Sequence, residues 1–135
     1  TFKLEIVTPE QILLARDAQS AIVPAYNGYF GILGGHAPFF SILRAGEVTV
    51  RMGAETAWYF LAGGFVEVTP DKVSLLTEAA EFVDKIDLTR AERARDRARQ
   101  RLDAADTLVD RVRARAALER AEGRIRVGRR KPSAP

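Results

Sequence analysis

The stretch Asp84-Lys85-Ile86-Asp87 separates two parts of a 135-residue chain that differ in charge and residue pattern. Residues 1–84 contain 5 Lys and Arg against 10 Asp and Glu, whereas residues 85–135 contain 16 against 8. The first part also holds most of the Gly and Pro and all of the aromatic residues. These differences predict an acidic body, residues 1–84, followed by a basic arm, residues 85–135.

Alternating apolar and polar residues indicate short strands throughout the body. Phe2, Leu4 and Ile6 alternate with polar residues, and the same period recurs in residues 47–51, 66–68 and 73–75. Turn-forming residues separate these stretches at Asn27-Gly28, Ala45-Gly46, Met52-Gly53, Gly63-Gly64 and Thr69-Pro70-Asp71. Many short strands with regular turns predict an antiparallel β-sandwich or barrel.

The arm has apolar residues at helical spacing in two segments. Asp87 is placed to cap a first helix, whose stripe is Leu88, Ala91, Ala94, Ala98, Leu102 and Ala105. Weakly helical residues 103–107 precede a second stripe, formed by Val109, Val112, Ala116, Leu118, Ala121 and Ile125. Gly123, Gly128 and Pro132 predict a fraying end, with a frayed basic tail from about residue 128. The pattern predicts an antiparallel two-helix hairpin.

The predicted helices meet mainly through alanine. Alanine buries far less apolar area than leucine, at about 25 cal/mol for each Å² removed from water, whereas Ala, Arg and Glu all favour the helix itself. We therefore expect two stable helices that are weakly joined. Such a pair can open and dock elsewhere when a partner or ligand favours one state, which is a first indication of a switch.

The composition excludes several kinds of site. Cysteine is absent and His36 is the single histidine, so thiolate and multi-histidine metal sites are excluded. We find no phosphate loop, nucleophile elbow or zinc-protease motif, and we expect no metal site and no catalysis by this chain alone. Only His36 is an ordinary base near neutral pH. Its Gly-rich loop favours a structural role.

Membrane insertion and nucleic-acid binding are both disfavoured. Residues 18–43 carry no charge and are long enough to cross a bilayer, but four glycines and two prolines interrupt them. The start of the chain lacks the pattern of a signal peptide, which favours the cytosol. Acidic residues interrupt the basic arm, and it has no aromatic residue for base stacking.

Four arginines of the arm have a spacing that brings them together in a hairpin. Arg90 and Arg97 are about 10 Å apart on one face of the first helix, and Arg120 and Arg124 share a face of the second. The pairs 90/124 and 97/120 are centred on the predicted turn near residue 107. Converging guanidinium groups match phosphate oxygens well, which suggests a polyphosphate site. The alternative is that these are solvated arginines beside ordinary acidic partners.

Two motifs and the order of the parts resemble a known family. The motifs are Gly28-Tyr29-Phe30-Gly31-Ile32-Leu33-Gly34-Gly35-His36-Ala37-Pro38 and Gly63-Gly64-Phe65-Val66-Glu67-Val68 with Pro70-Asp71-Lys72-Val73. Along essentially the whole chain they resemble the epsilon subunit of bacterial F-type ATP synthase, called delta in mitochondria.

The resemblance implies a flattened β-sandwich over residues 1–84, bound to the gamma subunit and resting on the c-subunit ring. It implies a mobile helical domain over residues 85–135 that extends toward the alpha and beta subunits and inhibits ATP hydrolysis. The chain would be a non-catalytic rotor subunit of the proton-translocating complex, peripheral at the cytoplasmic face of the bacterial inner membrane. The alternative is a constitutive assembly part whose arm only strengthens the rotor.

The resemblance also assigns residues of the body. The loop facing the c ring corresponds to Ala25, Tyr26, Asn27, Gly28, Tyr29 and Phe30. An acidic residue is common in the family where Tyr29 stands, so we expect an aromatic contact in place of a charge pair. Gly31, His36 and Pro38 are the expected structural residues of the first motif.

Some bacterial members of the family bind ATP in the folded arm through a signature like Ile-Asp-x-x-Arg-Ala, here Ile86-Asp87-Leu88-Thr89-Arg90-Ala91. The resemblance implies that the phosphates are bound by Arg90, Arg97, Arg120 and Arg124. It implies that the nucleoside end is shaped by Glu81, Ile86, Asp87 and Ala91. ATP would be a regulatory ligand, with no cofactor required and the participation of Mg²⁺ left open.

Overall fold

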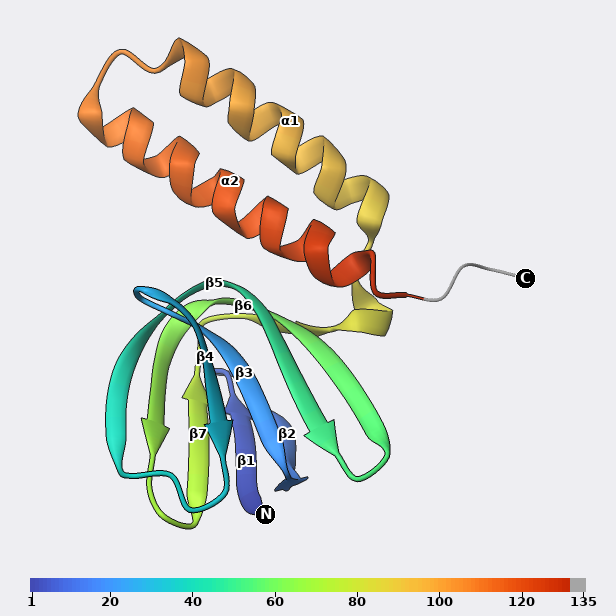
Figure 1. Ribbon diagram of the computed structural model, residues 1–135. Helices are drawn as coiled ribbons and strands as arrows, with labels where there is room; N and C mark the ends of the chain where they lie inside the picture. Colours follow the sequence, from blue (N-terminus) through green and yellow to red (C-terminus); the bar gives the residue numbers. More distant parts are fainter. Residues whose placement is uncertain (132–135) are drawn as a thin grey trace.

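The computed structural model describes residues 1–131, which form a body of strands and an arm of two helices (Figure 1). The strands are β1 (Phe2–Val7), β2 (Ile12–Ala18), β3 (Ser20–Ala25), β4 (Gly28–Leu33), β5 (Phe39–Met52), β6 (Glu55–Val68), β7 (Lys72–Leu76) and β8 (Ala80–Phe82). A short 3-10 helix, Val83–Lys85, leads to α1 (Leu88–Ala104) and α2 (Leu108–Gly128).

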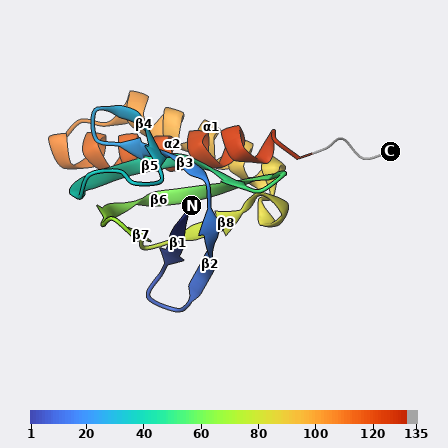
Figure 2. The same cartoon turned by 60° about the horizontal axis from the view of Figure 1, so that its bottom comes forward.

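The strands make one hydrogen-bonded sheet that folds over into a sandwich, with the helices stacked on one side of it (Figure 2). The strand order is β2-β1-β7-β6-β5-β3-β4, and β8 also pairs with β6. The predicted sandwich and helical hairpin are confirmed. One pairing departs from the antiparallel prediction, because β1 and β7 are parallel.

Two of the predicted turns are wrong. Ala45-Gly46 lies inside β5 and Gly63-Gly64 inside β6, and both long strands continue past these pairs. The φ angles of Gly63 and Gly64 are 104° and 133°, a conformation that favours glycine, and a Cβ on Gly64 would collide with the backbone of Leu76. The glycines let the β5–β6 hairpin curve over the body (Figure 1) instead of ending a strand. The other three predicted turns do connect strands.

The predicted alternation supplies the core of the sandwich. Its buried members are Phe2, Leu4, Ile6, Val48, Val50, Val66, Val68, Val73 and Leu75. Glu47 lies on the opposite face of β5 from Val48, as the alternation requires, yet it is only 2% exposed. The outer face of β5 is therefore covered by another part of the chain.

Tyr59 lies in the core of the body, with its ring edge-on to Phe82 at 5.2 Å between centroids. Burial raises the pKa of Tyr59 above its ordinary value, while the charge of Arg16 opposes the shift. The unfolded chain therefore loses this proton first, so we expect the stabilisation to be complete below about pH 10 and to fall as the pH rises further. Thermal unfolding at alkaline pH should show a shallower decline for Tyr59→Phe than for Tyr26→Phe, which changes an exposed tyrosine; equal slopes would contradict this.

The first helix has the predicted cap at Asp87, the turn lies where it was predicted, and the second helix has a cap at Thr107 that was not predicted. The Asp87 carboxylate accepts a hydrogen bond from the Arg90 backbone N–H at 3.0 Å, and the Thr107 hydroxyl accepts one from the Asp110 N–H at 3.1 Å. Each side chain satisfies a backbone donor that the first turn leaves free. No helix within residues 1–131 is both long and apolar enough to cross a membrane.

The second apolar stripe is only partly buried. Ala121 and Ile125 are buried as predicted, but Val109 and Val112 are 59% and 58% exposed. Positions 109, 116 and 123 share one face of α2, and only the later part of that face reaches the strands (Figure 1). The first turns of α2 therefore extend past the edge of the body, and the apolar side chains there stay exposed.

The predicted fraying near the end of α2 also differs from the structure. The helix continues through Gly123 to Gly128, and Arg130 and Lys131 make contacts with the rest of the chain. The end of α2 is ordered because it packs on the body, which helical propensity alone does not reveal. Pro132 lies outside the described residues.

Candidate functional site

Helix α2 joins the arm to the body, since it lies between α1 and the strands in Figure 1 and packs on β5 and β6. The helix packs tightly against the strands at Gly123. A Cβ built there would lie 2.9 Å from Cε1 of Phe60 and 3.3 Å from Cα of Gly46. A glycine is needed because no side chain fits between these surfaces.

A small apolar cluster, separate from the sandwich core, lies under the end of α2. It consists of the buried side chains of Phe60, Val83, Ile86 and Val127. Val127 is fully buried although it lies one residue before the end of the helix. The body, the linker and the arm therefore share one hydrophobic contact.

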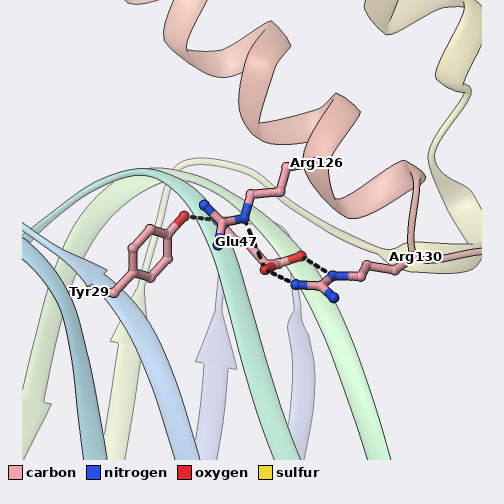
Figure 3. A network of polar contacts seen from close by, with 4 residues as sticks. All are labelled: Tyr29, Glu47, Arg126 and Arg130. Carbon is pink, nitrogen blue, oxygen red and sulfur yellow. Dashed lines mark hydrogen bonds and ion pairs between the residues drawn. The ribbon is translucent and has the colours of Figure 1, made fainter.

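Glu47 is the centre of the polar part of this contact (Figure 3). Its carboxylate accepts a hydrogen bond from Nε of Arg126 at 3.2 Å, and bonds from Nε and Nη2 of Arg130 at 3.0 and 3.1 Å. The side chain of Glu47 is 3% exposed, whereas those of Arg126 and Arg130 are 54% and 44% exposed. The hydrogen bond and the charge of Glu47 raise the pKa of Arg130.

This arrangement depends on the docked position of α2. A buried carboxylate is costly unless it is paired and hydrogen-bonded. The partners of Glu47 come from the end of α2 and the turn just after it, about 80 residues further along the chain. When α2 leaves, water must replace three charge-assisted hydrogen bonds. We call Glu47, Arg126 and Arg130 the arm latch.

Aromatic rings of the body contact arginines at the end of α2 and in the turn after it. The Tyr29 hydroxyl accepts a hydrogen bond from the Glu47 backbone N–H at 3.4 Å, and the Arg126 guanidinium lies 4.7 Å from the centroid of the Tyr29 ring. Arg130 lies 5.5 Å from the ring centroid of Trp58, and Arg124 lies 4.3 Å from that of Phe60. A cation over an aromatic face is attracted by the ring quadrupole.

An exposed ion pair lies at the edge of the contact, and we expect it to contribute little to stability. Nη2 of Arg44 is 2.7 Å from Oε1 of Glu119, but the two side chains are 55% and 37% exposed. Exposed pairs are screened by water and typically contribute about 0–1 kcal/mol. We expect Arg44→Ala to change the free energy of unfolding by less than about 1 kcal/mol, measured by urea denaturation. A loss as large as that of a latch variant would contradict this ranking.

The structure brings together some residues of the predicted ATP site. Nε of Arg124 is 2.6 Å from Oε1 of Glu81, which joins α2 to β8. Ile86 is buried beside Gly128, and Asp87 caps α1. Ala91 is buried, whereas Arg90 and Arg97 are exposed and Arg120 is half-buried. The convergence of the four arginines stays a prediction.

The predicted c-ring loop spans the end of β3 and the start of β4. Tyr26 is 70% exposed, while Tyr29 contacts Glu47 and Arg126 within this chain. His36 of the adjacent motif packs with Phe30 and Phe39, at 5.4 and 5.5 Å between ring centroids. Its Nδ1 lies 2.8 Å from the carbonyl oxygen of Ala37. The contact of this loop with a partner stays a prediction.

The contacts of the arm latch were not predicted from the sequence. Glu47 resembles any polar residue of a strand with one buried face, and Arg126 and Arg130 are two of many arginines in the arm. The four-residue spacing of Arg126 and Arg130 would place them on one face of a continuing helix, and it was the one local signal, although α2 ends at Gly128. Nothing nearby in the sequence identified their partner.

Two family models together match residues 1–128. The beta-sandwich domain of the ATP synthase Delta/Epsilon chain matches residues 1–83, and the long alpha-helix domain of the same chain matches residues 84–128.

Curated relatives named ATP synthase epsilon chain match most of the sequence. One from Nitratidesulfovibrio vulgaris (strain DP4) is 44% identical over 124 residues, which is 92% of each chain. One from Koribacter versatilis is 48% identical and covers 76% of this chain and 72% of its own, and one from Moorella thermoacetica is 41% identical and covers 93% and 95%.

Solved structures show the same fold at low sequence identity. A chain of the Euglena gracilis mitochondrial ATP synthase, described as OSCP/F1/c-ring, matches with a TM-score of 0.81 at 23% identity, covering 90% of this chain and 78% of that one. A chain of the Tetrahymena thermophila mitochondrial central stalk and c-ring matches with a TM-score of 0.71 at 15% identity, covering 94% and 96%.

Proposed function

Because the chain belongs to the ATP synthase delta/epsilon chain family, we propose that it is a central-stalk rotor subunit whose arm regulates ATP hydrolysis. The family is one of non-catalytic subunits of the synthase complex. The observation that carries the regulatory proposal is the arm latch, because it makes the docked arm a defined state that can be left by breaking a few named contacts.

An apolar face of the body supports association with the gamma subunit. Phe40, Ile42, Phe65 and Leu76 are between 43% and 60% exposed. Ile42 pairs with Phe65 and Phe65 with Leu76 across three strands, and the ring of Phe40 stacks on Phe65 at 5.5 Å. Contiguous exposed apolar side chains of this kind mark protein contacts. We also propose that residues 25–30 contact the c ring, because Tyr26 in this loop is exposed.

The start of α2 supports a second contact for the released arm, with the alpha and beta subunits. Leu108, Val109 and Val112 are exposed on its surface, with Arg111 and Arg115 beside them in a shallow groove. Apolar side chains flanked by arginines suit a partner surface that is apolar and acidic. The complex would lie peripherally at the cytoplasmic face of the membrane.

We further propose that ATP holds the arm down by binding Arg90, Arg97, Arg120 and Arg124, with or without Mg²⁺. The Glu81–Arg124 ion pair supports this proposal, because it joins two residues of the predicted ATP site that are 43 positions apart in the sequence. ATP shifts the balance only if it binds the docked arm better than the released one. ATP is therefore sensed and is not consumed at this site.

Titration of the full chain with ATP tests this site. We expect Arg90→Ala and Arg124→Ala each to weaken binding by roughly tenfold, the effect of losing one charge-assisted contact. Arg111→Ala removes an exposed arginine outside the set and should leave the affinity unchanged. Equal affinities for all variants and the parent would remove the assigned phosphate contacts.

A fixed arm is the second candidate, and the burial of Glu47 favours it, because a paired buried carboxylate resists opening. Truncation after Asp84 separates the two functions. If the arm inhibits ATP hydrolysis, the truncated subunit should still assemble with gamma and the complex should hydrolyse ATP faster. Unchanged hydrolysis would leave the arm with a structural role only.

A further inference from the structure

A second group of arginines lies on the other edge of the hairpin from the proposed ATP site. A cleft of about 430 Å³ between α1 and the end of α2 is lined by Arg95, Arg99, Glu122, Ile125, Arg126, Arg129 and Arg130. At 3.6 residues per turn, Arg95 and Arg99 lie roughly 140° and 180° around α1 from Arg90. The cleft therefore shares no arginine with the proposed ATP site.

The charges around this cleft do not balance. Five arginines line it, with Glu122 as the one acidic residue in the lining. Within residues 1–131, Glu47 pairs with Arg126 and Arg130, and Asp96 pairs with Arg95 at 3.1 Å. The carbonyls at the end of α2 also favour nearby cations. Arg99 and Arg129, both exposed, bring the remaining positive charge to the mouth of the cleft.

The latch leaves donors available to an anion in this cleft. A guanidinium has five N–H groups. Arg126 uses its Nε on Glu47, and Arg130 uses Nε and Nη2. More than half of the Arg126 side chain and nearly half of the Arg130 side chain are exposed. An anion can therefore bind the outer N–H groups while Glu47 keeps the inner ones.

We propose that this cleft binds an anion with more than one phosphate group and that the bound anion clamps the arm onto the body. Planar arginine forks match phosphate oxygens bidentately, and several phosphates are needed to reach arginines on both helices. The anion would tie α1 to α2 through Arg99 and Arg129, and to the body through the latch arginines. Its source is either a soluble oligophosphate or a lipid headgroup with two phosphates.

Binding of inorganic tripolyphosphate tests the proposal, in a full-length Arg90→Gln/Arg97→Gln background that disables the proposed ATP site. We expect Arg99→Gln/Arg129→Gln to weaken binding by at least about tenfold. Both residues are exposed and lie outside the latch. Arg111→Gln/Arg115→Gln removes the same charge from the start of α2 and should leave binding unchanged.

The second readout is amide hydrogen exchange of residues 121–128, which should slow when tripolyphosphate is added. Vesicles of equal parts phosphatidylcholine and cardiolipin distinguish the sources: binding to vesicles alone, lost in Arg99→Gln/Arg129→Gln, assigns the site to a lipid headgroup. Absence of binding to both probes, or equal weakening by the control pair, overturns the site. If tripolyphosphate binds but amide hydrogen exchange of residues 121–128 does not slow, the anion does not hold the arm on the body. These outcomes are independent of the proposed ATP site, because Arg90 and Arg97 are already replaced in the background variant.

Discussion

Glu47→Gln is expected to release α2 from the body. Glutamine keeps the shape of the side chain but removes its charge, and its amide nitrogen faces an arginine donor where an acceptor is needed. Three charge-assisted hydrogen bonds depend on this carboxylate. Because both arginines are about half exposed and regain water, we expect a loss of about 3 kcal/mol in the free energy of docking.

Amide hydrogen exchange measures this release. Exchange of the α2 amides from residue 121 to residue 128 should be about a hundredfold faster in Glu47→Gln, since each 1.4 kcal/mol is a factor of ten. Strand amides near Val48 and Val66 should stay protected. Arg44→Ala is the matched control, because it removes a body-to-α2 ion pair, between Arg44 and Glu119, at an exposed position. Equal exchange in both variants would show that the latch does not hold the arm.

A triple-mutant cycle with Arg126→Ala and Arg130→Ala shows whether the latch acts as a unit. Residues in one hydrogen-bonded network give non-additive changes in stability. Once Glu47 is replaced, removal of either arginine should cost little. Additive losses would mean that the arginines stabilise the arm by stacking on Tyr29 and Trp58 instead.

Gly123→Leu is expected to undock the arm by a different route. The added Cβ would lie 2.9 Å from the Phe60 ring and 3.3 Å from the Gly46 backbone. Moving the backbone of β5 to make room would disturb the core of the sandwich, so α2 should move away instead. We expect docking to weaken by about 3 kcal/mol, the upper end of the typical cost of overpacking.

The helical content measured by circular dichroism distinguishes undocking of the arm in Gly123→Leu from unfolding of the whole chain. Leucine favours a helix over glycine by roughly 0.8–1 kcal/mol, so the arm should stay helical by circular dichroism while exchange of the α2 amides accelerates. Glu122→Leu places the same leucine side chain at the neighbouring exposed position, where no collision arises, and this variant should stay docked. Loss of both helicity and strand protection in Gly123→Leu would contradict the proposed mechanism.

Local chemistry in the sequence was sufficient for the elements but not for the contact between them. The cap at Asp87 and the alternation around Val48 and Val66 depend on residues within one turn or one strand. The turn signals at Ala45-Gly46 and Gly63-Gly64 misled, because glycine is equally suited to a curved strand.

Contacts over long sequence distances explain what the sequence left open. Glu47 is buried because α2 covers the outer face of β5, and Val109 is exposed because the same helix extends past the body. Both outcomes follow from the docking position of α2, which no short segment encodes. Gly123 illustrates this most clearly, since a residue that predicts helix fraying is instead buried where α2 packs tightly against Phe60 and Gly46.

The distance between arm and body shows whether the Glu47 carboxylate holds α2 on the body. Because the chain lacks cysteine, spin labels can be placed through Thr56→Cys on the body and Asp106→Cys at the turn of the arm, both exposed. Pulsed electron paramagnetic resonance should give one narrow distance distribution for the otherwise unchanged chain and a broad, longer one for Glu47→Gln. The same narrow distribution in both proteins would contradict the claim.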